Sequence, residues 1–375
     1  LNNLADDIKI NKTFEEGGKD SLTKSKKSPM LKNFLAFVKD KEVFYFINMK
    51  KHISILIPKG HTSLVNIEGT HQIFNEVNSL LTSIGRNPVF DVQLVGLSRE
   101  TPQRNGLFKI SPDVLISEVK KTDLIIIPAI HGPVETALEN NKEFIPWIIH
   151  QYKNGAEIAA MCIATFFLAG TGLLNGKQCA THWRFTNEFR KKFPEANLVD
   201  DKIMTEDDGI YTSGGAYSFL NLNLYLIEKF AGRDVAILIS KAFMIDIDKN
   251  SQSPFIIFQG QKAHEDDSVK KVQNYIEENF REKISVDELA KEFALSRRSL
   301  ERRFKTATSN TVTEYIQRVK IEAAKKCLES TSENVNEVMY GVGYSDPKAF
   351  RIIFKRITGL SPVAYRNKYN PAVAA

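Results

Sequence analysis

Cys162 stands in the stretch AAMCIATFFLAG, where an apolar run changes into a helical pattern. Enzymes place nucleophiles on such a turn from a strand into a helix. The N-terminus of the helix is expected to lower the pKa of the thiol, and a neighbouring histidine would raise its reactivity further. A buried cysteine also serves as a small apolar packing residue. The stretch therefore leaves three roles open for Cys162: catalysis, packing, or one wall of a pocket that binds an effector.

A second group of residues that can do chemistry lies in the arginine-rich stretch SRRSLERRFKTA. Leu300 and Phe304 are four residues apart, so they lie on one face of a helix and pack inward. The other face carries Arg297, Arg298, Ser299, Arg302 and Arg303. The fork of an arginine matches phosphate oxygens and the O6 and N7 edge of guanine. We expect this face to bind double-stranded DNA.

A second cationic stretch, PKAFRIIFKRITG, lies further along the chain. Phe350 and Phe354 repeat the inward pair, while Ile352 occupies a position where a polar base reader could stand. The residues of the outer face that can reach phosphates are Lys348, Arg351, Lys355 and Arg356. We expect the first stretch to read the base sequence and the second to anchor mostly on the DNA backbone.

An internal repeat positions both stretches. VDELAKEFALSRRSLERRFK (286–305) parallels VNEVMYGVGYSDPKAFRIIFK (335–355), and each copy predicts a short helix, a tight turn and a second helix. Capping boxes that start these helices and the long helix between them pair Ser285 with Glu288, Thr311 with Glu314, and Asn334 with Glu337. The long helix can hold the two outer faces at the separation of adjacent major grooves, about 34 Å.

The front of the chain alternates strand and helix patterns instead. Short apolar runs predict buried strands, and stretches with helical spacing follow them. We expect strands at 52–58, 90–97, 122–129 and 156–162, helices at 71–85, 142–153 and after Cys162, and a strand, glycine turn and long helix over 210–232. Repeated βα units predict a three-layer, flavodoxin-like α/β domain with a mainly parallel sheet.

The change of pattern divides the chain into domains of different class. We expect a disordered extension over 1–48, the α/β domain over 49–245, a linker over 246–264, and an all-α domain with two helix-turn-helix units over 265–375. The net charge of +6 permits a nucleic-acid partner without requiring one.

The three cysteines, Cys162, Cys179 and Cys327, have no paired spacing, which argues against a disulfide framework or a zinc site. A reducing cytoplasm fits them best. The chain has no apolar run long enough for a membrane span, and its N-terminus lacks the pattern of a signal peptide. We expect a cytoplasmic protein without metal or cofactor.

Residues 265–370 resemble the AraC/XylS family of transcriptional regulators. ISVDELAKEFALSRRSLERRFK is similar to the first helix-turn-helix of that family, and GYSDPKAFRIIFKRITGLSPVAYR to its C-terminal signature. The resemblance implies a bipartite domain that contacts promoter DNA and often RNA polymerase. The positions that match base contacts of the family are Arg298, Glu301 and Arg302 in the first unit and Pro347, Lys348 and Ile352 in the second. Pro347 and Ile352 depart from the polar residues common there.

The stretch LAGTGLLNGKQCATHW (168–183) resembles the class I glutamine-amidotransferase-like superfamily, which includes intracellular proteases and hydratases. The resemblance spans about 50–240. It implies that Cys162 matches the nucleophile of the superfamily, His182 its histidine, and TSGG (212–215) one of its glycine turns.

Departures from that superfamily count against catalysis. The loop PKGHTSLVNIEG holds Glu68 as its only acid, late in the loop, and PAIHG lacks the paired glycines that often supply oxyanion N–H groups. We therefore expect an effector pocket in place of an enzyme. This pocket is formed by Cys162, Ile163, His131, His182 and Gly214. The alternatives are an active cysteine hydrolase or hydratase, and a redox sensor that uses Cys162.

The order of the two resemblances implies a sensor domain ahead of a DNA-binding domain. Regulators of this layout are often tied to nitrogen metabolism, so the resemblance implies a small nitrogenous effector. One such DNA-binding domain has limited affinity, and a second adds effective concentration. We therefore expect a homodimer.

Overall fold

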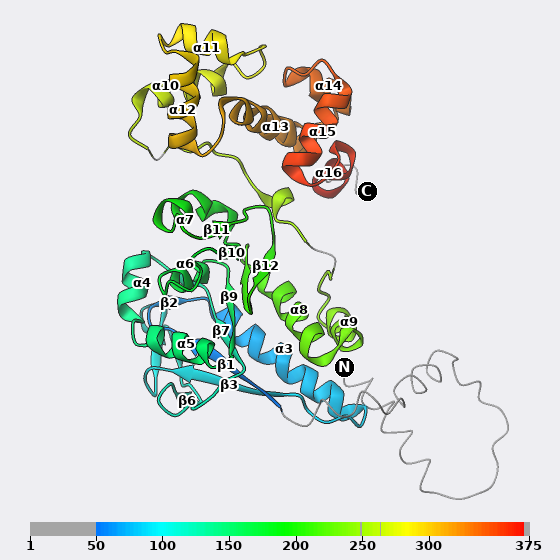
Figure 1. Ribbon diagram of the computed structural model, residues 1–375. Coiled ribbons are helices and arrows are strands. Elements are labelled where there is room, and N and C mark those ends of the chain that lie inside the picture. Colours follow the sequence, from blue (N-terminus) through cyan, green and yellow to red (C-terminus); the bar gives the residue numbers. More distant parts are fainter. Residues whose placement is uncertain (1–49, 248–249, 263, 371–375) are drawn as a thin grey trace, which may run out of the picture. The chain divides into compact units, whose positions relative to one another are not determined.

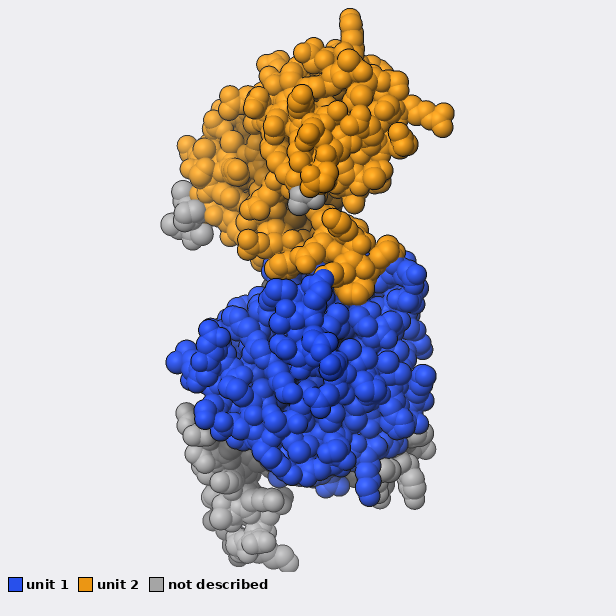
Figure 2. Space-filling view, turned by 90° about the vertical axis from the view of Figure 1, so that its left-hand side faces the viewer, with its two compact units in different colours: residues 1–182, 195–199, 203–249 blue, residues 183–194, 200–202, 250–375 orange. Residues whose placement is uncertain are grey.

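The computed structural model describes residues 50–247, 250–262 and 264–370, which divide into two compact units (Figure 2). The described part of unit 1 comprises 50–182, 195–199 and 203–247. Unit 2 comprises 183–194, 200–202 and the described residues from Asn250 onward. The extension expected over 1–48 lies outside the described residues.

Unit 1 is built on a seven-stranded sheet with the strand order β12-β13-β9-β7-β1-β3-β6 (Figure 1). The strands are β1 (Lys51–Ile57), β3 (Phe90–Gly96), β6 (Val114–Leu115), β7 (Leu124–Ile127), β9 (Glu157–Met161), β12 (Met204–Asp207) and β13 (Ile210–Ser213). Neighbouring strands pair in parallel except β12 and β13, which are antiparallel. The predicted mainly parallel sheet is confirmed.

Helices cover the two faces of this sheet (Figure 1). They are α3 (Leu64–Ser83), α4 (Val134–Asn140), α5 (Phe144–Lys153), α6 (Ala164–Ala169), α8 (Phe219–Ala231) and α9 (Arg233–Ala242). One core cluster joins the sheet to α3, α8 and α9 through buried residues such as Ile55, Phe74, Leu226 and Ile239. The predicted three-layer, flavodoxin-like arrangement is confirmed.

Short elements complete unit 1 at the ends of the strands. They are β2 (His61–Thr62) paired with β8 (Ile130–His131), β4 (Thr101–Gln103) paired with β5 (Phe108–Ile110), η2 (Arg104–Gly106), and β10 (Gln178–Cys179) paired with β11 (Asn197–Leu198).

Helix α3 begins earlier than the sequence pattern predicts. It starts at Leu64 and not near residue 71, so Glu68 is an exposed residue of this helix and does not lie in a loop. The buried stripe of α3 includes the polar residues Asn66 and Thr70 beside Ile67. Polar residues at buried positions weaken the apolar spacing by which a helix is predicted.

Unit 2 contains the helical domain (Figure 1). Its elements are η3 (Trp183–Phe185), α7 (Thr186–Lys192), η4 (Ser253–Phe255), α10 (Asp267–Glu278), α11 (Val286–Glu292), α12 (Arg297–Thr308), α13 (Val312–Ser330), α14 (Val335–Gly341), α15 (Pro347–Thr358) and α16 (Pro362–Tyr369). The capping boxes predicted at Ser285, Thr311 and Asn334 are present, with side-chain and backbone bonds in both directions. None of the described helices is long and apolar enough to span a bilayer.

The long helix α13 belongs to two separate cores. Its first half places Tyr315 against Leu300 and Phe304 of the first helix-turn-helix unit. Its second half places Leu328 in a cluster with Phe354 of the second unit. A single helix therefore carries both units, as the sequence predicts.

The residues that follow Asn250 belong to unit 2, although we assigned 246–264 to a linker. Phe258 packs edge-on against Tyr315, with ring centroids 5.1 Å apart. Lys325, which is 5% exposed, donates from Nζ to the carbonyl of Ile256 at 2.5 Å and to Glu322 at 2.7 Å. Glu322 accepts from the backbone N–H of Phe258 at 3.1 Å. We call residues 253–262 the strap segment, because Glu322 and Lys325 of α13 bond to its backbone.

Candidate nucleic-acid interface and effector pocket

Helix α12 is fixed from within unit 2. The side chain of Ser296 accepts from the backbone N–H of Ser299 and so caps the helix. Leu300 and Phe304 are fully buried, and Tyr315 stacks edge-on against Phe304 at 5.2 Å. The outer face of α12 therefore has a defined orientation, as readout of a base edge requires.

The four arginines of α12 divide into paired and unpaired residues. Arg297 contacts Asp287 at 3.0 Å and Glu301 at 3.2 Å. Arg303 forms a two-pronged pair with Asp266, at 2.8 and 2.6 Å. This bond to Arg303 lowers the pKa of Asp266.

Arg298 and Arg302 are exposed, and neither forms an ion pair with an acid of the described residues. Of the predicted DNA-binding set on this helix, Ser299 is half-buried and Glu301 is exposed. The charges of Arg298 and Arg302 are thus the ones most available to an external anion, while Arg303 ties α12 to the start of α10.

Helix α15 repeats this construction. Asp346 caps its start by accepting from the N–H of Lys348, and Pro347 occupies the first turn. Phe350 and Phe354 are buried, as predicted. The exposed residues of the outer face are Lys348, Arg351, Ile352 and Lys355. Arg356 is exposed too, but it donates to the side chain of Gln317 at 2.5 Å.

Lys320 of α13 connects the segment between α10 and α11 to the turn of the second helix-turn-helix unit. This buried side chain donates from Nζ to the carbonyl of Glu282 at 3.1 Å and to that of Gly343 at 3.0 Å. Burial lowers the pKa of Lys320. Gly343 has a φ of +75°, and a Cβ there would lie 2.1 Å from the carbonyl oxygen of Arg281. Only glycine lets the turn before α15 approach the segment between α10 and α11 this closely.

In unit 1, Cys162 lies on the turn between β9 and α6, as predicted. Its φ is +57°, an uncommon value for a residue with a side chain. Its carbonyl accepts from the hydroxyls of Thr165 at 3.0 Å and Thr181 at 3.2 Å. The side chain is 6% exposed. These bonds stabilise the strained turn of a nucleophile elbow.

The net pKa of the Cys162 thiol is raised, not lowered. Burial raises it to about 11, although backbone N–H groups of Ile163 and Gly215 act to lower it. The backbone N–H groups thus act in the expected direction, but removal from water outweighs them. At neutral pH the sulfur is a protonated thiol.

The other residues of the expected effector pocket come from separate strand ends. His131 is in β8 opposite His61, with ring centroids 5.2 Å apart. Burial, then the charges of His61 and Arg104, lower the pKa of His131. Ile163 precedes α6, and His182 is half-buried after β10.

The glycine turn after β13 differs in detail from the expectation. The N–H of Gly214 bonds to the carbonyl of Ile203 at 2.8 Å. The glycine whose N–H acts on the Cys162 thiol is Gly215, which has a φ of +90°. The sequence pattern identified the turn but not which of its glycines faces the thiol.

Sequence reasoning missed a set of buried polar residues behind the elbow. Asn223 donates to the hydroxyl of Thr70 at 3.1 Å, and Thr70 donates to the sulfur of Met161, next to Cys162, at 3.8 Å. Asn66 accepts from the N–H of Ala129 at 3.2 Å, while its Nδ2 has no hydrogen-bond partner among the described residues. Asn66 and Thr70 on the buried stripe of α3 were the available signal.

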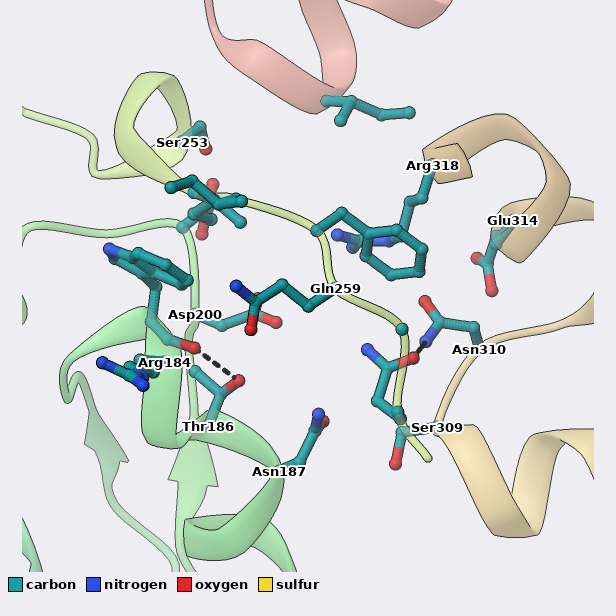
Figure 3. A pocket seen from close by; sticks show the side chains of 18 of the residues that line it. Arg184, Thr186, Asn187, Asp200, Ser253, Gln259, Ser309, Asn310, Glu314 and Arg318 are labelled. Carbon is teal, nitrogen blue, oxygen red and sulfur yellow. Dashed lines mark hydrogen bonds between the residues drawn. The ribbon is translucent and has the colours of Figure 1, made fainter. Parts of the chain in front are cut away.

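Unit 2 also contains a cavity of about 620 Å³ that polar and apolar residues line together (Figure 3). Asn310 donates to the side chain of Gln261 across part of its wall at 3.1 Å. Arg190 pairs with Asp200 at 3.1 Å. None of the five residues expected to form the effector pocket is among the described residues that line this cavity.

Two family models match the chain: the DJ-1/PfpI family over residues 68–229 and a helix-turn-helix domain over residues 289–368. The HTH-type transcriptional regulator GbdR of Pseudomonas aeruginosa is 25% identical over 265 residues, which cover 70% of this chain and 71% of GbdR. ArgR, an HTH-type transcriptional regulator of the same species, is 25% identical over 217 residues, or 58% of this chain and 66% of ArgR. Drosophila melanogaster DJ-1beta, a solved structure, is 20% identical, with a TM-score of 0.44 over 53% of this chain and 100% of its own.

The chain joins a DJ-1/PfpI domain to an AraC-type helix-turn-helix domain. This is the architecture of a transcriptional regulator, and both resemblances drawn from the sequence are confirmed. Cys162, His131 and His182 fall within the DJ-1/PfpI match. Helices α12 and α15, with Arg302 and Ile352, fall within the helix-turn-helix match.

Proposed function

We propose that this protein is a sequence-specific regulator whose AraC-type domain places α12 and α15 in adjacent major grooves of one DNA duplex. The observation that carries the proposal is the pair of exposed cationic faces on two capped helices that share α13. Arg298 and Arg302 on the first face, and Lys348, Arg351 and Lys355 on the second, supply the charges that contact DNA. Phosphate neutralisation gives such binding its affinity, and base edges give it specificity.

In the DJ-1/PfpI domain we propose an effector pocket at the elbow, with Cys162, Ile163, His131, His182 and Gly214 as its residues. A protonated, buried thiol supports this role better than turnover, because the thiolate is the nucleophile. The effector is a small nitrogenous metabolite, in keeping with the resemblance. Asn66, with its unpaired amide nitrogen, is an additional candidate for the polar wall.

The regulatory step is a linkage between effector and DNA. An effector that binds one arrangement of the domains or of a homodimer more tightly shifts the population toward that arrangement. This shift changes how two AraC-type domains engage DNA in the cytoplasm and present themselves to RNA polymerase. Two linked domains also raise the effective concentration of the second contact.

Catalysis or redox sensing by Cys162 is the second candidate function. The elbow φ of +57° favours it, since strained backbone gathers at functional sites. This candidate needs a thiolate near neutral pH, whereas the effector-pocket role does not. The reactivity of the thiol therefore separates the two.

The test of DNA binding uses the full chain, duplexes selected from a random pool, and random duplexes of the same length. Arg302→Ala is expected to lose most of its preference for the selected sites. Lys348→Ala is expected to weaken binding to both pools alike and to reduce the salt slope by about one. Fluorescence anisotropy over a salt series measures both effects.

Lys153→Ala, which removes an exposed lysine from α5 of the other unit, is the control and should bind as the unmodified chain does. Equal losses from Arg302→Ala and Lys348→Ala on selected and random DNA would contradict the division between base reading and backbone contact. Absence of any salt-sensitive binding would contradict the function itself.

A further inference from the structure

The helices α12 and α15 are structurally equivalent, residue by residue. Each has 12 residues, follows a side-chain cap, and ends at a residue in the left-handed conformation, Ser309 in one and Gly359 in the other. The buried Phe304 and Phe354 each meet a tyrosine edge-on, at 5.2 and 5.5 Å with the same interplanar angle of 82°. The two helices therefore present their outer residues from matching positions.

The equivalence extends to the hydrogen bonds beside these helices. Thr308 and Thr358 each donate to the carbonyl of the buried phenylalanine four residues earlier, at 2.7 and 2.8 Å. Tyr315 and Tyr365 each donate to a glutamate, at 2.6 and 2.5 Å. Counted from the buried phenylalanines, Arg302 and Ile352 occupy the same position.

The two helices carry side chains of different chemistry at this shared position, one charged and one apolar. Arg302 presents an exposed guanidinium that pairs with no acid among the described residues. Ile352 presents an aliphatic side chain that is 58% exposed, although the same helix buries Phe350 and Phe354 completely or nearly so. The cationic Lys348 and Lys355 lie one turn before and after Ile352.

We propose that the two helix-turn-helix units read different bases from this one position. Arg302 donates its fork to the O6 and N7 atoms of guanine in the first half-site. Ile352 packs on the C5-methyl group of thymine in the second, which is the only apolar group that a base pair offers in the major groove. The inference rests on the proposed function and extends it: the second unit reads a base and is more than a backbone anchor.

The surroundings of Ile352 suit this role. Lys348 and Lys355 can bind phosphates on either side of Ile352. These contacts would bring the middle of α15 close to the base edges in the major groove. Contact with a methyl group removes apolar surface of both partners from water, so an exposed isoleucine gains where a polar side chain would lose its hydration. The predicted target is therefore asymmetric, with an essential guanine and an essential thymine about one helical turn apart.

The test replaces single atoms of the DNA. With the full chain and a selected duplex, each thymine is exchanged in turn for deoxyuridine, which lacks only the methyl group. One or two thymines in one half-site are expected to lose about three- to fivefold in affinity, the worth of one buried methyl. Exchange of a guanine for 7-deazaguanine in the other half-site removes the N7 acceptor and is expected to cost at least about fivefold.

Two variants assign these losses to residues. Ile352→Ala should bind the thymine and deoxyuridine duplexes equally, while Ile352→Val should keep the difference. Arg302→Ala should keep the methyl dependence and lose the sensitivity to 7-deazaguanine. Both positions are exposed, so neither change removes a core contact, and circular dichroism checks that the variants keep their helices.

The outcomes separate this inference from the proposed function. Salt-sensitive, sequence-specific binding without any methyl-dependent thymine would overturn the inference and leave the function standing. Methyl dependence that persists in Ile352→Ala would also overturn it, because another residue would then make the contact. Absence of DNA binding would overturn both.

Discussion

At the scale of single residues, burial decides the chemistry of Cys162. The strand-to-helix turn supplies the backbone N–H groups that favour a thiolate, yet the sulfur is so far removed from water that its pKa rises to about 11. The backbone conformation of a nucleophile elbow and the ionisation of its thiol are therefore separate properties. Cys162 has the elbow conformation, but its raised pKa keeps the thiol protonated near neutral pH.

The raised pKa predicts how alkylation of Cys162 depends on pH. Because only the thiolate reacts with iodoacetamide, and because the thiol is almost fully protonated near pH 7, the rate should rise about tenfold per pH unit until it levels near pH 11. Mass spectrometry of the peptide that contains Cys162 measures the rate. Rapid modification that is independent of pH between about 6 and 8 would instead support a catalytic or redox thiolate.

At the scale of elements, the strap segment belongs to the DNA-binding domain, because its backbone bonds to the half-buried Glu322 and the buried Lys325. A fragment that begins at Asn250 should therefore melt at a higher temperature than one that begins at residue 265, which lacks the strap. Phe258→Ala in the longer fragment should remove about 2 kcal/mol of its free energy of unfolding, since Phe258 is only partly buried.

Urea denaturation followed by circular dichroism measures these differences. Ile257→Ala, at an exposed neighbouring position of the strap, is the matched control and should change the free energy of unfolding by less than about 0.5 kcal/mol. Identical stability of the two fragments would show that the strap contacts contribute nothing to the fold.

The elements that the sequence predicts well are those that local residues determine. Capping boxes such as Ser285 with Glu288, and the repeated phenylalanine pairs, act within one helical turn, so their residue types reveal them directly. The alternation of apolar strands with helices was sufficient for the parallel sheet. The cysteine elbow was located for the same reason.

The features that the sequence did not predict depend on partners that lie far away along the chain. Arg303 reads as a free cation until it meets Asp266, 37 residues away. The strap carries the apolar run PFIIF, but its backbone bonds to Glu322 and Lys325 join residues 64 and 69 positions apart, which residue types do not reveal. Burial of the thiol, like the buried polar stripe at Asn66 and Thr70, follows from how whole elements pack.

At the scale of the whole molecule, one helix, α13, holds together α12 and α15, the two helices that we propose as recognition helices. Buried contacts of α13 to both units, through Tyr315 and Leu328, leave the helices little freedom to move apart. An insertion of about five base pairs between the half-sites should abolish specific binding by rotating one half-site to the far side of the duplex. An insertion of about ten should also abolish it, since α13 cannot lengthen.

Anisotropy titrations measure the affinity for the parent duplex and for the duplexes with about five and about ten inserted base pairs. A target that tolerates ten inserted base pairs but not five would indicate a flexible connection between the units, contrary to the packing of α13.

The ammonium group of Lys320, held between the carbonyls of Glu282 and Gly343, has a consequence for the set of promoters that such a protein can serve. We expect the distance between the two halves of a target to be constant, because α13 packs into the cores of both units and Lys320 bonds to the segment before α11 and to the turn before α15. New targets can thus arise by exchange of bases at fixed positions. They cannot arise by adding or removing base pairs between the half-sites. Every promoter of this regulator should therefore have the same half-site spacing.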